Sequence, residues 1–513
     1  MVDYSKNNKR IAKNTILLYA RMLMLMLISL YTSRVNLQAL GVADFGIYNV
    51  VGGVVAMFSL LSGSLSAATS RFITFELGKG DKERLKKVFS STVTIQLILI
   101  LIIVILLESI GLWLLNNKMV IPADRMEAAN WLFQFSIISF AVNLWSIPYN
   151  ATIIAHEKMS AFAYISIFEA SAKLAIAFLI VRNPFDRLIY FGLLILVVSL
   201  IIRFLYNVYC KKHFEECHYT FIWDKSILKE IFGFAGWNFI GASAVVLKDA
   251  GGNVLLNMFF GPIVNAARGI AMQVNGAVYG FVSNFTMALN PQITKNYALE
   301  NFEYMMKLVF QGARLSYYIL LFICLPILVN TQYILELWLG QVPEHATDFV
   351  RLVLLYTMSE SLASTLITAT LATGQIKKYQ ILVGGCQLLN LPLSYFLLKL
   401  GLGPNIVFVV AIGLSITGEL IRVILLRQLI HLSARQFLFK VYFNVFAVTV
   451  VAAVSPLVLQ HYMPKGFCTF VLLSGLCVLC CIGAILYVGC NKDERFIVYS
   501  KTKAVLKIKF SKS

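Results

Sequence analysis

The residues best suited to chemistry in this sequence are charged side chains placed inside long apolar stretches. Residues 16–40 show the pattern, because Arg21 and Arg34 interrupt a run long enough to cross a bilayer. A charge at the bilayer centre costs at least about 2.5 kcal/mol, so such groups are expected to face the protein interior and to bind substrates or ions. This criterion selects four cations as substrate contacts, Arg21, Lys248, Arg268 and Arg314, and four further groups as charge partners or ion-coupling groups, Asp249, Glu169, Lys173 and Glu360.

Helix geometry separates the two arginines of the first stretch. A helix that enters the membrane near Asn14 carries Arg21 about 10 Å deep and Arg34 about 30 Å deep, at a rise of 1.5 Å per residue. Arg34 then lies near the far interface and reaches water along its aliphatic stem. Arg21 is deeper, and we predict that it faces a cavity.

Lys248 and Asp249 fall near the middle of the apolar run that contains GASAVVLKDAGGNVLL. Adjacent residues on a helix point about 100° apart, so the two are not expected to form a close pair along one face. The glycines predict an interrupted helix, which is a common device at transporter binding sites. We predict that Lys248 contacts phosphate and that Asp249 is its partner or an ion-coupling acid.

Other midspan charges leave two interpretations open. Glu169 and Lys173 lie four residues apart, and Glu419 and Arg422 lie three apart, so each pair shares a helix face. Such pairs either neutralise each other structurally or serve transport. Glu360 stands near the centre of its run, whereas Arg268 and Arg314 lie within about 10 Å of a run's end.

Composition places these charges in a membrane. The chain has 513 residues, of which 59% are hydrophobic and only 13% charged, and its mean hydropathy is +0.77. Soluble domains are nearer 45–50% apolar and about 25% charged. Apolar runs predict an all-α polytopic membrane protein of about 14 transmembrane helices, with approximate limits 14–36, 46–70, 89–115, 128–154, 160–182, 188–210, 232–259, 262–289, 308–330, 346–373, 379–399, 405–427, 440–462 and 467–489.

The distribution of basic residues gives an orientation. With the N-terminus inside, cytoplasmic segments hold about 29 of the 44 Lys and Arg residues, and the opposite segments about six. Both termini are therefore predicted to be cytoplasmic, and the first run is interpreted as an uncleaved span. The net charge of +19 is explained by attraction to anionic lipid of the bilayer rather than by nucleic-acid binding.

Enzyme motifs are absent from the sequence. It has no Walker sequence, no dinucleotide fingerprint and no nucleophile elbow, and its loops are too short for a folded domain. We expect a transporter without ATPase activity, with no catalytic residue and no cofactor. The segment CKKHFEECH, residues 210–218, has metal-ligand residue types but no zinc spacing, so we predict a solvated loop and no metal site.

An internal repeat organises the chain. LGVADFGIYNVV and, later, KKVF recur about 220 residues on as FGPIVNAARGIA and KLVF, an offset of six spans. An even offset keeps both halves in the same orientation, which predicts parallel six-helix lobes around a central cavity. The predicted divisions are an N-lobe at 1–215, a C-lobe at 216–435, and two appended helices with a basic cytoplasmic tail at 436–513.

The segment TSRVNLQALGVADFGIYNVVGGVV, followed by SAATSRFITFELGKGD, resembles the polysaccharide repeat-unit (Wzx-type O-antigen) flippases of the multidrug/oligosaccharidyl-lipid/polysaccharide (MOP) exporter superfamily. The likeness is strongest over residues 14–90. It implies a flippase in the bacterial inner membrane that moves undecaprenyl-diphosphate-linked oligosaccharide from the cytoplasmic to the periplasmic leaflet by alternating access, for O-antigen, capsule or exopolysaccharide. It also implies polymerase and glycosyltransferase partners of the same pathway.

The resemblance gives one residue a role. Related lipid II flippases carry an arginine in the cytoplasmic half of the first span, and Arg21 matches that position. A guanidinium can bind a diphosphate through two parallel hydrogen bonds. The alternatives are a MATE-like ion-coupled multidrug antiporter, for which the cation-rich set is unexpected, a lipid II flippase, and a membrane glycan polymerase, for which a large outer loop is missing.

Overall fold

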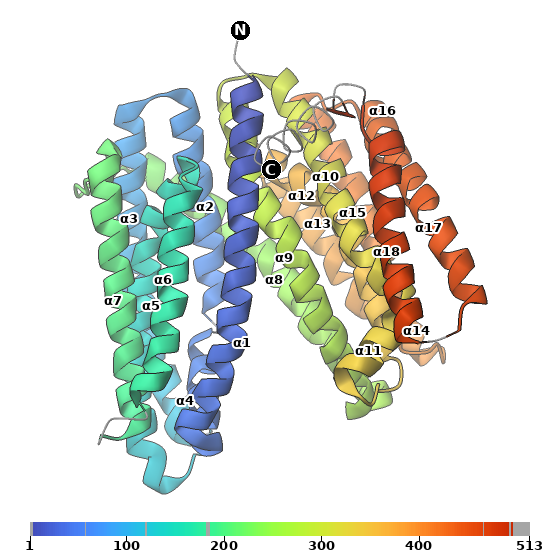
Figure 1. Cartoon of the computed structure of the whole chain (residues 1–513). Helices are drawn as coiled ribbons and strands as arrows, with labels where there is room; N and C mark the ends of the chain where they lie inside the picture. The colour runs from blue at the N-terminus through green and yellow to red at the C-terminus, as the bar shows by residue number, and fades with distance from the viewer. Residues whose placement is uncertain are drawn as a thin grey trace, which may run out of the picture. The chain divides into compact units, whose positions relative to one another are not determined.

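The computed structural model describes residues 4–56, 58–117, 119, 121–180, 185–464, 466–491 and 494–495, and most of these residues lie in helices joined by short turns and loops (Figure 1). These residues contain no strand, which confirms the all-α fold class. The long helices are α1 (Tyr4–Ala56), α2 (Ser59–Lys79), α3 (Lys82–Leu106), α5 (Met126–Ala155), α6 (Met159–Leu179), α7 (Arg187–His213), α8 (Lys225–Phe260), α9 (Pro262–Ala298), α10 (Phe302–Val329), α12 (Ala346–Thr373), α15 (Ile406–Ile430), α17 (Asn444–Tyr462) and α18 (Phe467–Ala484). Shorter helices are α4 (Leu112–Asn117), α11 (Thr331–Leu339), α13 (Lys377–Leu388), α14 (Asn390–Lys399) and α16 (Ala434–Phe437), with π-helical turns at Leu107–Gly111, Leu438–Phe443 and Ile485–Gly489.

Twelve segments of the described residues are long and apolar enough to cross a membrane. This number agrees roughly with the predicted count of about fourteen. The two predicted spans outside the twelve, 46–70 and 262–289, are helical as well, and they fall on α1 with α2 and on α9. Both are rich in glycine, serine or amide side chains, so the difference lies in their polarity and not in their backbone.

Helix boundaries repeat along the chain with the offset seen in the sequence. α3 and α10 begin at Lys82 and Phe302, α5 and α12 at Met126 and Ala346, and α7 and α15 at Arg187 and Ile406, so each pair is about 220 residues apart. Gly41 and Gly261 are also equivalent, and both adopt left-handed φ angles, 79° and 77°. A side chain at either position would be strained, which explains why glycine occurs at both.

Packing divides the chain into two compact units. Unit 1 comprises the described residues as far as Ser243, together with Met287–Asn301 and Leu371–Gln380. Unit 2 comprises Ala244–Thr286, Phe302–Thr370 and the described residues from Ile381 onward. The predicted domain divisions at 215 and 435 stay a prediction.

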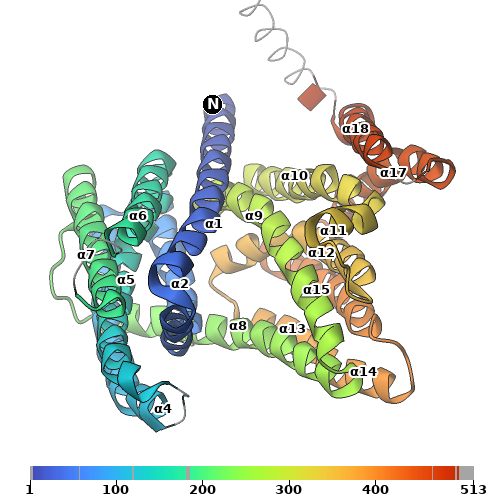
Figure 2. The same cartoon turned by 60° about the horizontal axis from the view of Figure 1, so that its bottom comes forward.

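Each unit is a helix bundle with its own apolar core. In unit 1, α5 packs against α7 and α2, and α1 packs along α6. Phe89 and Tyr149, which are buried and meet edge to face with centroids 5.3 Å apart, belong to this core. In unit 2, α17 and α18 lie side by side and α18 packs on α10 (Figure 2).

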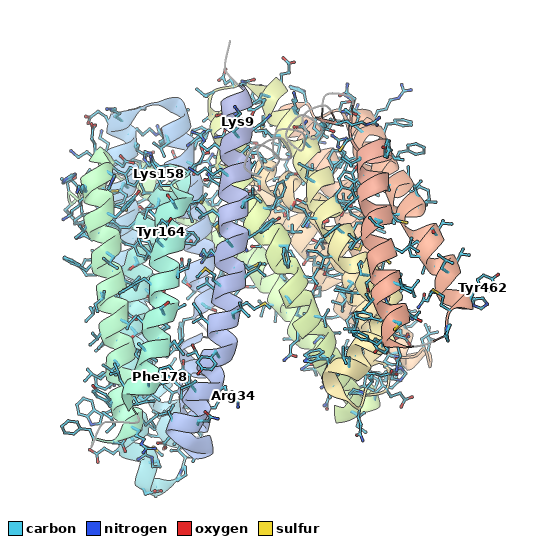
Figure 3. All side chains as sticks on the ribbon, viewed as in Figure 1. Lys9, Arg34, Lys158, Tyr164, Phe178 and Tyr462 are labelled. Carbon is cyan, nitrogen blue, oxygen red and sulfur yellow. The ribbon has the colours of Figure 1, made fainter. Side chains whose placement is uncertain are left out.

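An ion cluster fixes one end of unit 1. Arg125, at the start of α5, donates to Asp44 from Nε (2.8 Å) and Nη2 (2.6 Å), and to Asp186 from Nη1 (2.5 Å). Asp186 also caps α7 by accepting from the backbone N–H groups of Leu188 and Ile189 at 3.0 and 3.1 Å. Asp44 belongs to the motif LGVADFG, so this part of the motif has a structural function. Figure 3 shows Arg34 and Phe178 towards one end of this bundle and Lys9 and Lys158 towards the other.

Asp186 makes this end of unit 1 sensitive to acid. Partial burial alone would raise the pKa of its carboxyl, but the hydrogen bonds from Arg125, Ile189 and Leu188 hold the pKa below its ordinary value of 3.8. A lowered folded-state pKa gives a stabilisation that is complete above the unfolded pKa and is lost as pH falls through the folded one.

We expect Asp186→Asn to reduce thermal stability by removing the charge while keeping a helix cap, and Asp186→Ala to cost about 1 kcal/mol more because the cap is lost too. The stability difference between the wild type and Asp186→Asn should stay constant from about pH 8 to about pH 5 and shrink only at more acidic pH. Thermal unfolding in detergent across this range measures both. A difference that already closes between pH 7 and pH 5 would contradict the assignment.

Candidate functional site

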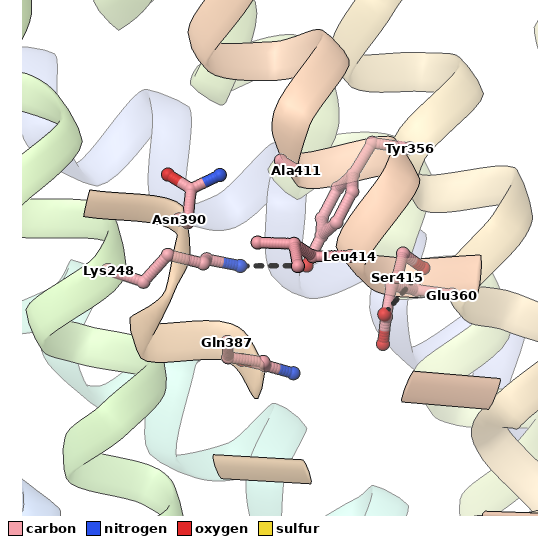
Figure 4. A pocket seen from close by; sticks show the side chains of 8 residues that line it. All are labelled: Lys248, Tyr356, Glu360, Gln387, Asn390, Ala411, Leu414 and Ser415. Carbon is pink, nitrogen blue, oxygen red and sulfur yellow. Dashed lines mark hydrogen bonds between the residues drawn. The ribbon is translucent and has the colours of Figure 1, made fainter. Parts of the chain in front are cut away.

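A buried polar network in unit 2 brings together several of the charges selected from the sequence (Figure 4). Side chains from α8, α12, α13, α14 and α15 surround a small cleft with about 190 Å³ of empty volume. The cleft is lined by Lys248, Tyr356, Glu360, Gln387, Asn390, Ala411, Leu414 and Ser415.

Lys248 is the cation of this cleft. Its side chain is only 9% exposed, and its Nζ donates to the Tyr356 hydroxyl at 2.8 Å (Figure 4). The same ammonium lies 4.7 Å from the Tyr356 ring centroid, close enough for a cation–π contact. Asp249 Oδ1 is 3.7 Å from Nζ. We expected Lys248 and Asp249 not to form a close pair. This was wrong, because the flexible lysine stem turns back and brings Nζ within ion-pair distance of Asp249.

Glu360 is held from two sides by α15. Ser415 donates to its Oε1 at 2.7 Å, and Arg422 Nη2 lies 3.8 Å from its Oε2. Arg422 is 2% exposed and is the largest fully buried side chain among the described residues. The carboxylate of Glu360 thus neutralises a guanidinium that has left water completely.

Glu419 is a second acid close to the same arginine. It is 1% exposed, and its Oε2 accepts a hydrogen bond from the Tyr442 hydroxyl. Its Oε1 is buried and has no hydrogen-bond partner within the described part of the chain. Burial of an unsatisfied carboxylate oxygen is costly, so this carboxyl is suited to accept a proton.

Tyr442 reaches Glu419 from the π-helical turn Leu438–Phe443. Single π-helical turns shift the side chains that follow them and are frequent at functional sites. Sequence reasoning did not select Tyr442 or Tyr356, because a tyrosine in an apolar run has no charge to mark it. The spacing of Glu419 from Arg422 was the only available signal for this part of the network.

The sequence predicted a helix break around Lys248, but the structure has its break in a different segment. α8 runs without a break from Lys225 to Phe260, so that prediction was wrong. The interruption is between α13 and α14, at Leu389. Pro392 has no N–H to donate to the carbonyl of Leu388, which explains the break there. The break carries Gln387 and Asn390 into the cleft.

Arg268 of α9 lies against α8 near the cleft. Gly252 of α8 lies four residues after Lys248, on the same helix face. A Cβ added at Gly252 would be 3.5 Å from Arg268 Nη2, so Arg268 packs against this face. Arg268 is 9% exposed, and its Nε has no hydrogen-bond partner among the residues described. Lys248, Asp249, Glu360 and Arg268 therefore belong to one region of unit 2.

Arg21, Glu169 and Lys173 belong instead to unit 1. The Arg21 guanidinium stacks on the Phe162 ring at 4.3 Å, where α1 packs along α6, and Glu169 lies within its electrostatic reach. Lys173 donates to Glu169 at 2.6 Å, so these two neutralise each other as the sequence spacing allows. Arg21 Nε is buried and has no hydrogen-bond partner in the described residues.

Arg314 lies apart from both regions. It donates to the backbone oxygen of Gly489 at 3.1 Å and to Glu494 at 2.8 Å. These contacts join α10 to the end of the last helical segment. Nη1 and Nη2, which we assigned to a substrate, thus bond to the protein itself, whereas Nε is buried without a hydrogen-bond partner among the described residues.

The segment 210–218 is only partly the solvated loop that we expected, because Lys211, Lys212, His213, Glu215 and His218 are exposed and the other four residues are buried. Cys210, Glu216 and Cys217 are buried, and His156 makes a 2.6 Å hydrogen bond with Glu216. Within the described residues, no group of three or more His, Cys, Asp or Glu could hold a metal ion. The segment closes the end of unit 1 by packing.

A second buried acid, Glu157, organises that same end of unit 1. It has a left-handed φ of 58°, and its side chain is 1% exposed. Arg10 Nε is 2.7 Å from its Oε2, whereas Gln292 (2.7 Å) and Lys295 (3.0 Å) donate to its Oε1. We call Arg10, Glu157, Gln292 and Lys295 the inner latch, because they tie the end of α9 to α1.

A further contact ties the turn after α12 to α2. Arg71 donates to the backbone oxygen of Ala372 at 3.0 Å. Gly374, with a left-handed φ of 74°, lies so close that an added Cβ would be 2.7 Å from Arg71 Nη2. Glycine is favoured there by the left-handed backbone angle, and a larger side chain would also displace the Arg71 guanidinium.

Comparison with known proteins agrees with this architecture. The MatE family model matches residues 251–396. An outward-facing multidrug-resistance MATE family transporter of the MOP superfamily superposes with a TM-score of 0.72 at 13% identity, over 83% of this chain and 96% of that one. A MATE transporter in the straight conformation gives 0.71 at 14% over the same shares.

The fold is that of the MATE transporters. A MOP superfamily transporter from Pyrococcus furiosus, described as having a binding pocket of reversed polarity that suggests a different function, also superposes, with a TM-score of 0.66 at 14% identity over 83% of this chain and 96% of that one. No curated relative matches the chain. These likenesses show the fold, and none of them concerns O-antigen.

We expect Tyr442→Phe to destabilise the protein by about 1–3 kcal/mol, because it removes a hydrogen bond to a buried carboxyl. Replacing Glu419 by Gln in the Tyr442→Phe background should recover part of the loss. Thermal unfolding in detergent measures both.

Tyr317→Phe is the matched control, because it deletes an equivalent hydroxyl whose partner is the neutral Thr449 at 3.0 Å. A loss no larger for Tyr442→Phe than for Tyr317→Phe would contradict the assigned role of Tyr442.

Proposed function

We propose that this protein is an alternating-access exporter of the MATE type, driven by antiport of a proton or another small cation, and that the polar network of unit 2 carries the coupled cation. The observation on which this rests is that two carboxyls, the partly buried Glu360 and the buried Glu419, lie near one buried arginine, Arg422. The MATE fold and the match over residues 251–396 support the transporter class.

The roles follow from the contacts of each side chain. Glu419, with one carboxyl oxygen unsatisfied, takes the proton, and Tyr442 holds the carboxyl in place. Glu360 and Arg422 form the charge pair whose strength changes with the protonation of Glu419. Lys248 and Asp249, at the mouth of the same cleft, pass the change in charge to the substrate.

Energy from an ion gradient is consistent with the sequence, which has no nucleotide-binding motif. The excess of Lys and Arg in alternate loops supports an inner-membrane protein with both termini in the cytoplasm. With that orientation, the inner latch lies at the cytoplasmic end of unit 1.

A second candidate function is a flippase for undecaprenyl-diphosphate-linked oligosaccharide, with the polymerase and glycosyltransferases of the pathway as partners. It is favoured by Arg21 and Arg268, two largely buried guanidiniums whose Nε atoms have no hydrogen-bond partner in the described chain. It is also favoured by the resemblance of LGVADFGIYNVV. An anionic headgroup would satisfy such donors.

Opening of the inner latch would be the step that changes access from the cytoplasm to the transport path. Gln292 and Lys295 belong to the second repeat by sequence but pack within unit 1. Opening requires that Glu157 lose these partners, and a buried carboxylate without partners costs several kcal/mol. The latch therefore opens only when another interaction offsets this cost.

We expect purified protein in liposomes to export a cationic dye when a pH gradient is imposed. Glu419→Gln should reduce the gradient-driven rate at least about tenfold, because a neutral amide cannot exchange the proton. Glu360→Gln should have a similar effect, because it removes the charge that pairs with the buried Arg422. Glu344→Gln, a variant at a side chain that is 82% exposed, is the control and should transport normally.

The same liposomes separate the two candidate functions. A flippase would translocate a short-chain polyprenyl-diphosphate saccharide, would lose this activity in Arg268→Met, and would not transport the dye in the wild type. That combination of results would replace drug antiport by lipid flipping as the function. Dye export that is independent of any ion gradient in the wild type would contradict the proposed coupling.

We expect Glu157→Gln to open the inner latch, because the charge that binds Arg10 and Lys295 is removed. The measurement is the rate at which a water-soluble maleimide labels Thr294→Cys, a buried position beside the latch, with the exposed Cys468 replaced by Ser.

Glu303→Gln, at an exposed residue in the first turn of α10, is the control for this labelling. Glu157→Gln should label several-fold faster than this control. Equal labelling rates would show that Glu157 does not hold the latch closed.

A further inference from the structure

Unit 1 contains an open cleft that the proposed transport does not use. It lies among α3, α5 and α7 and the segment that follows α7, and it has about 1,090 Å³ of empty volume. Its polar lining includes Arg203, Asn207, Lys211, His218 and Tyr219, and no Asp or Glu lines it.

Arg203 is the central residue of this cleft. It is 8% exposed, and its Nε and Nη1 are buried and have no hydrogen-bond partner within the described residues. Its guanidinium stacks on two aromatic rings of α5, 4.4 Å from the centroid of Trp145 and 4.1 Å from that of Tyr149. Aromatic faces fix the orientation of a guanidinium but do not satisfy its N–H donors.

The internal repeat shows what Arg203 lacks. α7 and α15 begin at Arg187 and Ile406, so Arg203 is the counterpart of Arg422. In the second repeat, Arg422 pairs with Glu360, and Glu419 lies one turn before it. The equivalent positions in the first repeat are Phe140 and Leu200, and neither can neutralise a cation.

The repeat thus keeps the arginine in unit 1 while both acids are absent, and Leu200 lines the open cleft where Glu419 would otherwise stand. A buried guanidinium without an acid is stabilised when an external anion supplies the missing charge. Phosphate oxygens match the planar fork of guanidinium donors.

The walls of the cleft indicate the source of that phosphate. Leu97, Leu200 and Phe204 line it and are exposed on the outside of the bundle. Lys211 lies in the basic last turn of α7, and His218 lies in the segment that follows this helix. Apolar walls beside a cationic end suit an acyl chain attached to an anionic headgroup.

We propose that this cleft binds a phospholipid of the surrounding leaflet, with the headgroup phosphate on Arg203 and one acyl chain along Leu97 and Phe204. The phosphate takes the position that the Glu419 carboxylate occupies in the second repeat. Lys211 adds positive charge at the rim and favours an anionic headgroup over a zwitterionic one.

The test uses the purified full-length protein and native mass spectrometry after addition of phosphatidylglycerol, phosphatidylcholine or inorganic phosphate. We expect the wild type to retain one phosphatidylglycerol in preference to phosphatidylcholine, and to retain inorganic phosphate no better than a control protein. No preference for the anionic lipid in the wild type would overturn the proposal. Equal retention of inorganic phosphate would overturn the lipid as the source.

Two variants locate the site. Arg203→Met should weaken retention of phosphatidylglycerol about tenfold, as expected for the loss of charge-assisted hydrogen bonds. Leu200→Glu should do the same without removing any cation, because it restores the acid of the second repeat beside Arg203. Arg34→Met removes an exposed guanidinium at the other end of unit 1 and should retain the lipid normally. Retention unchanged by Leu200→Glu and Arg203→Met would overturn the assignment.

Discussion

A charge that leaves water for the interior of a membrane protein must find a partner, and the structure of this chain follows from how each buried charge does so. Arg422, fully enclosed, is neutralised by Glu360, and Arg314 by Glu494. Glu157 is enclosed by Arg10 and Lys295. Each pair also joins segments that are distant in the sequence. The contacts that offset the cost of burial therefore also stabilise the bundle to which they belong.

The internal repeat gives the two units a common plan, but they use it differently. An arginine is kept in the equivalent helices α7 and α15, as Arg203 and Arg422. Acids surround it in the second repeat, where they form a closed network suited to carrying a cation. Aromatic rings surround it in the first repeat, where the cleft is open and the charge remains for a ligand. In the functions that we propose, exchange of two residues separates ion coupling in one repeat from lipid contact in the other.

The sequence predicted much of the fold, because apolar runs, basic loops and a repeat of about 220 residues are local signals. It also selected Lys248, Asp249 and Glu360, since a charge in an apolar run is conspicuous. It did not find Tyr442 or Tyr356, whose hydroxyls become important only when helices from distant segments meet. It assigned Arg314 to a substrate, because the position of a charge along a helix says nothing about the carboxylate of Glu494, 180 residues later. We expected a helix break in α8 because of its glycines, but α8 is continuous. The break is instead between α13 and α14, where Pro392 has no backbone N–H to donate.

The central claim is that Glu419 holds a proton within the buried network of unit 2. Infrared difference spectroscopy of the reconstituted protein, recorded between neutral and alkaline pH, tests it directly, because a protonated carboxyl absorbs at a frequency that no carboxylate shares. The account predicts a protonated-carboxyl band at neutral pH that disappears at alkaline pH and is missing in Glu419→Gln. A spectrum without that band, or a band that persists unchanged in Glu419→Gln, would contradict it.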